Sequence, residues 1–301
     1  MYLNVIEKVN SMKKQEKNFI ILETLNHNAL LCEGVITKNT YVFFGKGIGF
    51  KRKSGEKFVV DGNVQNALTV LTSEEASQYR DLVEMVENKK LIAAVQEVVS
   101  QANKFFGGHI NANLNLTLLD HLNFALERKK RNIIINYPFL NELKFIYPKE
   151  YEFSERAFNY LNVKCGENVK FDEAELGFLV LHFHAAVTDS KVSKVLRNNE
   201  IIYDSKKIIE DSIREKIDLD SIYYSRFVKH LEYAIHRFKN GIKLENILLD
   251  SIKTKCSMDY EIAVKLNEML KEKYKIDLDE DEIGYLAIHI YNLRNRKTNI
   301  D

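Results

Sequence analysis

The chain repeats two of its own segments in the same order. Segment 121–128 (HLNFALER) returns 109 residues later as 230–237 (HLEYAIHR), and segment 171–183 (FDEAELGFLVLHF) returns 107 residues later as 278–290 (LDEDEIGYLAIHI). A repeat of about one hundred residues has the size of a whole domain rather than that of a solenoid unit. The sequence therefore predicts a duplicated domain, and each copy carries two histidines at equivalent positions.

A different pattern precedes the repeats. Short runs rich in β-branched and aromatic residues begin at Phe19, Ala29, Thr40 and Ile48, and turn-forming residues separate them. These runs predict a small antiparallel sheet of four strands. About forty residues are few for an independent core, so we expect a dimer that buries one sheet face.

Beyond Gly62 the patterning predicts helices for the rest of the chain. The two prolines, Pro138 and Pro148, both fall in a segment that we interpret as a connection between helices of the first copy. The expected fold class is multidomain, with a small antiparallel β module followed by two homologous all-α bundles. The expected domains are an N-terminal extension, the β module and the two helical copies, at residues 1–18, 19–62, 69–187 and 188–301.

Composition excludes some classes of protein. Lys and Arg total 44 against 43 Asp and Glu, so no global basic field indicates a nucleic-acid partner, and any such site must be local. The three cysteines form no CxxC pair, which is typical of a reducing cytosol. The sequence shows neither a signal peptide at its start nor an apolar run of the roughly 18 residues that span a bilayer. We expect a soluble, cytoplasmic protein.

A local basic and aromatic cluster lies in the β module. Segment 45–55 (GKGIGFKRKSG) contains four basic residues, several glycines and one phenylalanine. Lysine and arginine contact phosphates, and the ring of Phe50 offers a surface on which an unpaired RNA base stacks. Asn26 and Asn28 present amide groups suited to base edges. The alternative is a hairpin with solvated lysines and Phe50 in its core; a P-loop is excluded because GxxxxGK[ST] is absent.

The combination of this cluster with the duplicated helical domain resembles the BglG/SacY-type transcriptional antiterminators. These consist of a co-antiterminator RNA-binding domain followed by two phosphotransferase-system regulation domains, or PRDs, and the likeness covers residues 19–301 in the family's order. The segment GKGIGF is most similar to glucose-operon members. In this family the β module is a symmetric dimer that binds a hairpin in nascent messenger RNA and prevents terminator formation. The resemblance assigns RNA binding to Asn26, Asn28, Gly45, Lys46, Phe50 and Lys51.

The resemblance also implies a role for the repeated histidines. In the family they accept phosphoryl groups from the histidine phosphocarrier protein and from the sugar-specific enzyme II of the phosphotransferase system. The positions that match are His121 and His182 in the first PRD, and His230 and His289 in the second. The family further implies inhibition through the first PRD and activation through the second, without enzymatic activity or a cofactor.

Helical spacing suggests partners for these histidines. Residues seven apart lie on one face of a helix, so His121 shares a face with Arg128, and His230 with Arg237. A guanidinium there pairs with a phosphohistidine, which makes Arg128 and Arg237 candidate phosphate-sensing residues.

The same spacing places a carboxylate opposite the second histidine of each copy. Glu175 is predicted to face His182, and Glu282 to face His289, where either carboxylate would fix the imidazole tautomer. The competing interpretation, which we favour, is that Asp172-x-x-Glu175 and Asp279-x-x-Glu282 are helix N-terminal caps, in which the positive end of the helix dipole favours the acids.

Three other readings of the histidines compete with the antiterminator. A metal site is disfavoured because His182 and His184 point in different directions on a helix, and the second copy has Tyr291 in place of His184. A phosphorelay carrier would explain the histidines but not segment 45–55. A PRD-containing DNA-binding activator would need a helix-turn-helix ahead of the repeats, where the sequence predicts strands instead.

Overall fold

The computed structural model describes residues 18–27, 29–36, 38, 40–45, 47–61, 64–70, 78, 81–108, 110–111, 113–165 and 170–295. The expected N-terminal extension, residues 1–18, lies outside these ranges except for its last residue. The chain divides into two compact units, one of residues 1–137 and 149–192 and the other of residues 138–148 and 193–301. Among the helices of the described residues, none is long and apolar enough to cross a membrane.

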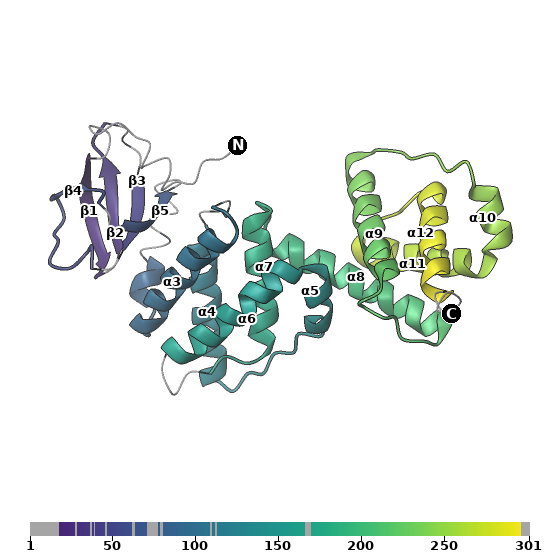
Figure 1. Ribbon diagram of the computed structural model, residues 1–301, viewed down its shortest axis with the longest axis horizontal. Helices are drawn as coiled ribbons and strands as arrows, with labels where there is room; N and C mark the ends of the chain where they lie inside the picture. Colours follow the sequence, from purple (N-terminus) through teal and green to yellow (C-terminus); the bar gives the residue numbers. More distant parts are fainter. Residues whose placement is uncertain are drawn as a thin grey trace. The chain divides into compact units, whose positions relative to one another are not determined.

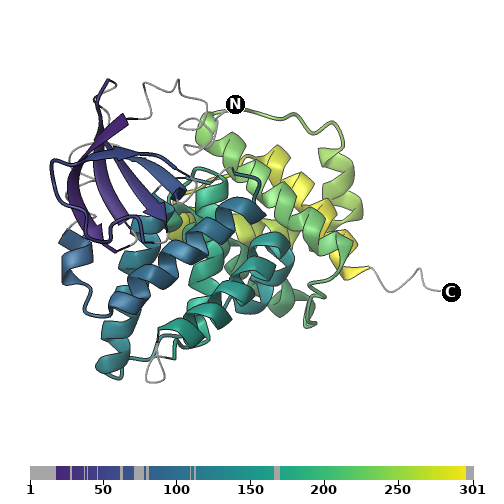
Figure 2. The ribbon, with the colours of Figure 1, turned by 60° about the vertical axis from the view of Figure 1, so that its left-hand side comes forward.

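The first unit begins with an antiparallel sheet (Figure 1). Its strands are β1 (Asn18–Asn26), β2 (Ala29–Gly34), β3 (Thr40–Gly45), β4 (Lys57–Val59) and β5 (Val64–Val70), in the spatial order β4-β1-β2-β3-β5. Irregular register along β1, between Ile21 and Glu23 and again between Thr24 and Asn26, bends the β1–β2 pair. The curvature of the sheet is visible in Figure 2.

The sequence predicted the first three strands correctly, but the fourth was wrong. Residues 47–51 form consecutive turns, in which the N–H of Phe50 donates to the carbonyl of Gly47 at 3.0 Å. Gly47 and Lys51 have φ values of 72° and 59°, which an extended strand does not allow. The outer strands are instead β4 and β5. Since β5 pairs with β3, the expectation of helix directly beyond Gly62 is wrong, and the sheet extends past the expected boundary at residue 62.

Both faces of the sheet are buried within the chain. One face has its own core of aromatic and aliphatic side chains, in which Phe19 lies edge-on to Phe43 at 4.7 Å between ring centroids. Ile48, on the turn after β3, closes part of this core. On the opposite face Leu31 and Phe44 belong to the same hydrophobic cluster as the helices of the first unit. A dimer is therefore not required to bury these side chains.

The helices of the first unit follow the sheet. They include α3 (Lys89–Phe105), α4 (Leu114–Lys130), α6 (Pro148–Lys164) and α7 (Ala174–Val187). The side chain of Asn88 caps α3 by accepting from the backbone N–H groups of Lys90 and Leu91. Their apolar faces form one core around Leu118, Leu122 and Phe183, all fully buried.

The helices of the second unit are α5 (Leu140–Ile146), α8 (Val192–Ile213), α9 (Ile222–Asn240), α10 (Leu249–Lys255), α11 (Ser257–Tyr274) and α12 (Glu280–Arg294). Ser221 caps the start of α9, and Gly241 ends it in the left-handed conformation with φ of 65°. The predicted connection around Pro138 and Pro148 therefore contains a helix of its own, α5, which packs in the second unit although it belongs to the first copy by sequence.

Candidate functional site

Each helical copy brings its two histidines into contact. In the first copy, His121 on α4 and His182 on α7 lie with their ring centroids 4.9 Å apart. In the second, His230 on α9 and His289 on α12 lie 4.7 Å apart. Since 61 residues separate His121 from His182, and 59 separate His230 from His289, the duplicated sequence builds the same histidine pair twice through the packing of two helices.

A glutamate connects the first histidine to an arginine in the first copy. Glu175 Oε2 lies 2.7 Å from His121 Nε2, and Glu175 Oε1 lies 2.6 Å from Arg128 Nη2. The expected contact between Glu175 and His182 is wrong. Glu175 lies in the first turn of α7, which packs against α4, and its carboxylate contacts His121 and Arg128 of that helix.

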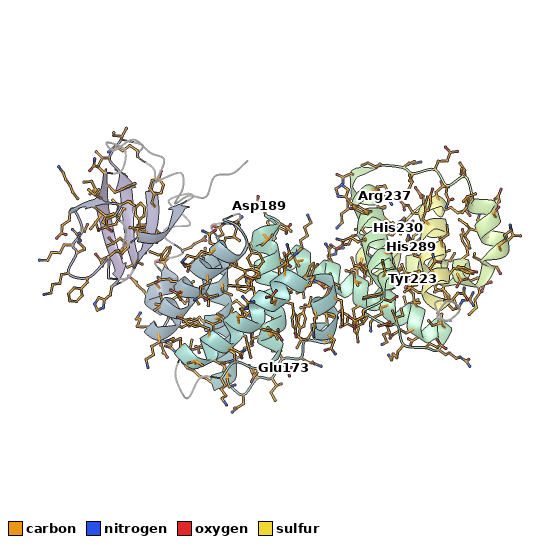
Figure 3. All side chains as sticks on the ribbon, in the orientation of Figure 1. Glu173, Asp189, Tyr223, His230, Arg237 and His289 are labelled. Atoms are coloured by element: carbon orange, nitrogen blue, oxygen red, sulfur yellow. The ribbon has the colours of Figure 1, made fainter. Side chains whose placement is uncertain are left out.

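The second copy repeats this arrangement with one difference. Both carboxylate oxygens of Glu282 contact Arg237, one through Nε and the other at 2.9 Å from Nη2, while His230 Nε2 lies 3.5 Å from Glu282 Oε2. Glu282 therefore contacts His230 rather than His289, which corrects the second spacing prediction. Figure 3 shows His230 and His289 side by side, with Arg237 further along α9.

The capping interpretation holds only for the aspartate of the second copy. The side chain of Asp279 accepts from the backbone N–H of Glu282 at 3.0 Å and caps α12. The Glu282 side chain turns away to Arg237. In the first copy no side chain caps α7, and Asp172 pairs with Lys129 at 2.9 Å.

Burial controls the charge of the second histidine in each pair. Burial, followed by the nearby His121, lowers the pKa of His182 to about 3, and its Nδ1 is buried without a hydrogen-bond partner. Burial, His230 and Arg226 lower the pKa of His289 to about 4. Both rings are therefore neutral at pH 7 and keep a lone pair. Burial opposes ionisation of Glu282, but its contacts with His230 and Arg237 prevail and lower its pKa to about 2.

Aromatic rings flank the first histidine of each pair. Phe178 lies 5.1 Å from His121 between ring centroids, and Tyr285 lies 5.7 Å from His230. Behind Phe178, Tyr137 packs where α7 has Gly177, because a Cβ at that glycine would lie 2.5 Å from the Tyr137 ring. These neighbours were not predicted, although Phe178 and Tyr285 occupy equivalent positions in the repeated segments.

The first histidine pair opens on a groove of about 700 Å³. Its lining includes His121, His182, the half-exposed ring of Phe124, and the carboxylates of Asp120 and Asp189. In the second copy Lys229 replaces Asp120 and pairs with Glu232 at 3.1 Å. The two histidine pairs therefore differ in the charge that an approaching partner meets.

Two further histidines of the helical copies lie within the described residues and have other contacts. His184 Nδ1 lies 2.9 Å from Glu150 Oε1, and His236 is exposed beside Asn240. Within the described part of the chain, no group of three or more His, Cys, Asp or Glu residues is placed to hold a metal ion.

In the β module, the turn after β3 contacts the turn between β1 and β2. The N–H of Gly49 donates to the carbonyl of His27 at 3.0 Å, and the ring of Phe50 lies edge-on to the His27 ring at 5.5 Å. Phe50 is 56% exposed, and the Lys51 ammonium lies 5.4 Å from its centroid. Phe50 is therefore not in the core of a hairpin; Ile48 takes that place. His27 was missed as a member of this surface.

Other residues of the predicted RNA surface are described in part. Gly45 ends β3, opposite Val64 of β5, and Arg52 and Lys53 are exposed. Asn26 is described in its backbone alone, and Asn28 and Lys46 lie outside the described residues. The exposed ring and its basic neighbours, Lys51, Arg52 and Lys53, are called the Phe50 surface below.

Comparison with known proteins identifies the class to which this architecture belongs. Residues 19–75 match the CAT RNA binding domain, and residues 96–186 and 204–293 match the PRD domain. The chain belongs to the BglG/SacY-type antiterminator family, in which a CAT RNA-binding domain precedes two PRDs.

Particular relatives place the chain within this family. It is 32% identical over 284 residues to Protein GlcT of Staphylococcus saprophyticus subsp. saprophyticus, covering 93% of this chain and 99% of the relative. It is 30% identical over 290 residues to the GlcA/glcB genes antiterminator of Staphylococcus carnosus, covering 94% and 99%. The crystal structure of GlcT CAT-PRDI superposes with a TM-score of 0.51 at 28% identity, covering 57% of this chain and 99% of that one.

Proposed function

We propose that this chain is a transcriptional antiterminator that binds a hairpin in nascent messenger RNA through its β module and is regulated by phosphorylation of its PRD histidines. The observation that carries the proposal is the match of a CAT RNA-binding domain and two PRDs, in that order, over most of the chain. Relatives of similar length bear names that include an antiterminator of glc genes, which supports a glucose-type operon as the target.

The Phe50 surface supports the RNA-binding part of the proposal. An exposed aromatic ring in a soluble protein loses favourable burial unless a partner covers it, and unpaired bases stack on such rings. The neighbouring Lys51, Arg52 and Lys53 supply positive charge for the phosphates on either side of a stacked base. The residues assigned by family resemblance, Asn26, Asn28 and Lys46, complete the proposed surface.

The histidine pairs support regulation by charge. Adding a phosphoryl group brings about two negative charges next to an existing carboxylate and an arginine. The ion pairs between Glu175 and Arg128, and between Glu282 and Arg237, must then rearrange. Such a local change biases a two-state element, here the proposed homodimer, without any enzymatic step by this chain.

A binding experiment tests the RNA-binding part. A hairpin RNA obtained by in vitro selection against the full chain is titrated with the wild-type chain and with Phe50→Ala, using fluorescence anisotropy. Loss of one stacked base costs about 1–3 kcal/mol, so the dissociation constant should rise roughly 5- to 150-fold. The matched control is Tyr233→Ala, which removes an aromatic ring of similar exposure, 60%, from the second unit. Equal affinities for Phe50→Ala and the wild type, or failure to select any RNA, would contradict the proposal.

Phosphopeptide mapping tests the regulatory part. The full chain is incubated with the histidine phosphocarrier protein and phosphoenolpyruvate, and separately with the charged sugar-specific enzyme II. Label should appear on His121, His182, His230 or His289, and His→Ala variants should remove it one position at a time. Label confined to the exposed His236, or no label from either donor, would exclude this mode of regulation.

A further inference from the structure

The first histidine of each pair presents the same nitrogen to a glutamate. His121 Nε2 lies 2.7 Å from Glu175 Oε2, within hydrogen-bond distance, whereas His230 Nε2 lies 3.5 Å from Glu282 Oε2 and is buried without a hydrogen-bond partner. The glutamate side chains are 4% exposed, so water does not replace them at this position. In both copies Nε2 is the ring nitrogen that faces the glutamate, although the distances and the surrounding charges differ, which points to a shared chemical role.

We infer that Glu175 and Glu282 are positioning residues that make Nδ1 of His121 and His230 the nitrogen that receives the phosphoryl group. An ionised carboxylate only accepts hydrogen bonds, so the nitrogen facing it carries the proton. In a neutral imidazole the other nitrogen then keeps the lone pair. The inference rests on the proposed phosphorylation and specifies the atom at which it occurs.

Phosphoryl transfer exchanges the donor's P–N bond for a new P–N bond on the accepting ring. The Nδ1 lone pair of His121 attacks the phosphorus of the donor's phosphohistidine, and the donor's P–N bond breaks with its electron pair returning to the donor imidazole. The accepting ring then holds phosphorus on Nδ1 and a proton on Nε2, and so gains a positive charge. Glu175 faces that charge directly. The carboxylate of Glu175 therefore interacts more strongly with the ring in the product, and in the transition state that leads to it, than with the neutral ring before transfer.

The arginine of each site holds the glutamate in place. In the first copy the Glu175 carboxylate divides its oxygens between His121 and Arg128, whereas in the second copy both oxygens of Glu282 contact Arg237. His230 Nε2 is consequently farther from its glutamate, at 3.5 Å, than His121 Nε2 is from its own, at 2.7 Å. We expect the control of the tautomer to be tighter at His121.

Nitrogen NMR on the full chain tests this assignment directly. In the unphosphorylated chain, labelled with 15N-histidine, His121 and His230 should show the tautomer protonated at Nε2. Glu175→Gln and Glu282→Gln should shift each affected ring toward a mixture, because an amide both donates and accepts. After phosphorylation by the phosphocarrier protein or by enzyme II, the wild-type spectrum should place phosphorus on Nδ1. The transfer rate to the affected histidine should fall by about tenfold or more in the Gln variants, the value expected when a charge-assisted hydrogen bond is lost.

Matched controls separate a positioning role from a structural one. Glu173→Gln and Glu280→Gln remove exposed carboxylates from the start of α7 and from the first turn of α12, and should leave tautomer and rate unchanged. A proton on Nδ1 of the wild-type rings, or phosphorus on Nε2, would overturn the inference. If neither donor phosphorylates any histidine, the proposed regulation fails, while the tautomer measurement still decides whether the glutamates set the proton's position.

Discussion

At the scale of single residues, the chain uses the same four side chains twice. A histidine pair, a glutamate and an arginine recur in both copies, and the predicted proximity of Arg128 to His121 is realised through Glu175 rather than by direct contact. The second histidine of each pair is the more unusual group, because burial lowers its pKa and keeps the imidazole neutral; His182 is buried and His289 is half-buried. This neutrality has a consequence for stability.

The free energy of unfolding should fall as the pH drops from 7 to 5. The folded-state pKa of His182 is about 3 against an ordinary value of 6.5, so only the unfolded chain takes up the proton in this range. Stability is therefore full above pH 6.5 and is lost as the pH falls toward 3; the part lost by pH 5 is about 2 kcal/mol from His182. Glu282, with a pKa of about 2, changes the free energy of unfolding mainly below pH 4.5, outside this window.

Urea unfolding of the full chain at pH 7 and pH 5, followed by circular dichroism, measures this effect. His182→Asn should reduce the difference between the two pH values, and the exposed His236→Asn should not. A pH dependence that His182→Asn leaves intact would show that another group is responsible.

At the scale of elements, equivalent helices do not keep equivalent partners. Helix α10 packs against α11 and α12 of its own copy, whereas α5, its counterpart in the first copy, packs against α9 in the second unit. Glu142 of α5 is buried and lies 3.1 Å from Lys206 of α8, which also lies 3.6 Å from Glu210. A partly buried lysine therefore lies between two buried glutamates and ties α5 to α8.

Replacing Lys206 by Met should destabilise the second unit by about 3–5 kcal/mol, because it leaves the buried Glu142 without a cation. Glu210 keeps a second partner, the exposed Lys216 at 2.9 Å, so the loss centres on α5. Chemical denaturation of the full chain measures the change, with the adjacent exposed Lys207→Met as control. In the double variant Lys206→Met with Glu142→Gln, most of the lost stability should return. If Lys206→Met alone costs less than about 1 kcal/mol, the ion pair contributes little to stability.

At the scale of the whole molecule, a nearly neutral chain concentrates positive charge where the RNA is proposed to bind. The formal net charge is +1, so long-range attraction by the whole protein is weak. The Phe50 surface is exposed and lies at one end of the sheet, where two turns meet. Binding should therefore depend on a few local phosphate contacts.

The salt dependence of RNA binding measures those contacts. Lys51→Gln and Lys53→Gln should each reduce the slope of log affinity against log salt by about one. Each substitution removes one phosphate contact, so binding releases about one fewer counterion from the RNA. Lys271→Gln, which removes an exposed lysine from the second unit, should leave the slope unchanged. Slopes equal in all four proteins would place the phosphate contacts elsewhere.

The sequence by itself determined the duplication, the order of a β module before two helical copies, three of the five strands and the histidines of interest. Each of these depends on local patterns: a period of two along strands, turn-forming residues, and identity between repeated segments. Helical spacing also placed Arg128 and Arg237 on the correct face.

Only the tertiary structure decided which groups meet across elements. Glu175 and Glu282 contact the first histidine of each pair because packed helices bring together residues more than 45 positions apart. Spacing within one helix cannot predict such contacts. β5 joins the sheet by pairing with β3, whose residues lie 19 to 30 positions earlier in the chain. α5 packs in the second unit, where its buried Glu142 pairs with the partly buried Lys206 of α8. The sequence specifies which charged side chains are present. Tertiary packing, which excludes water around them, determines which of them form pairs.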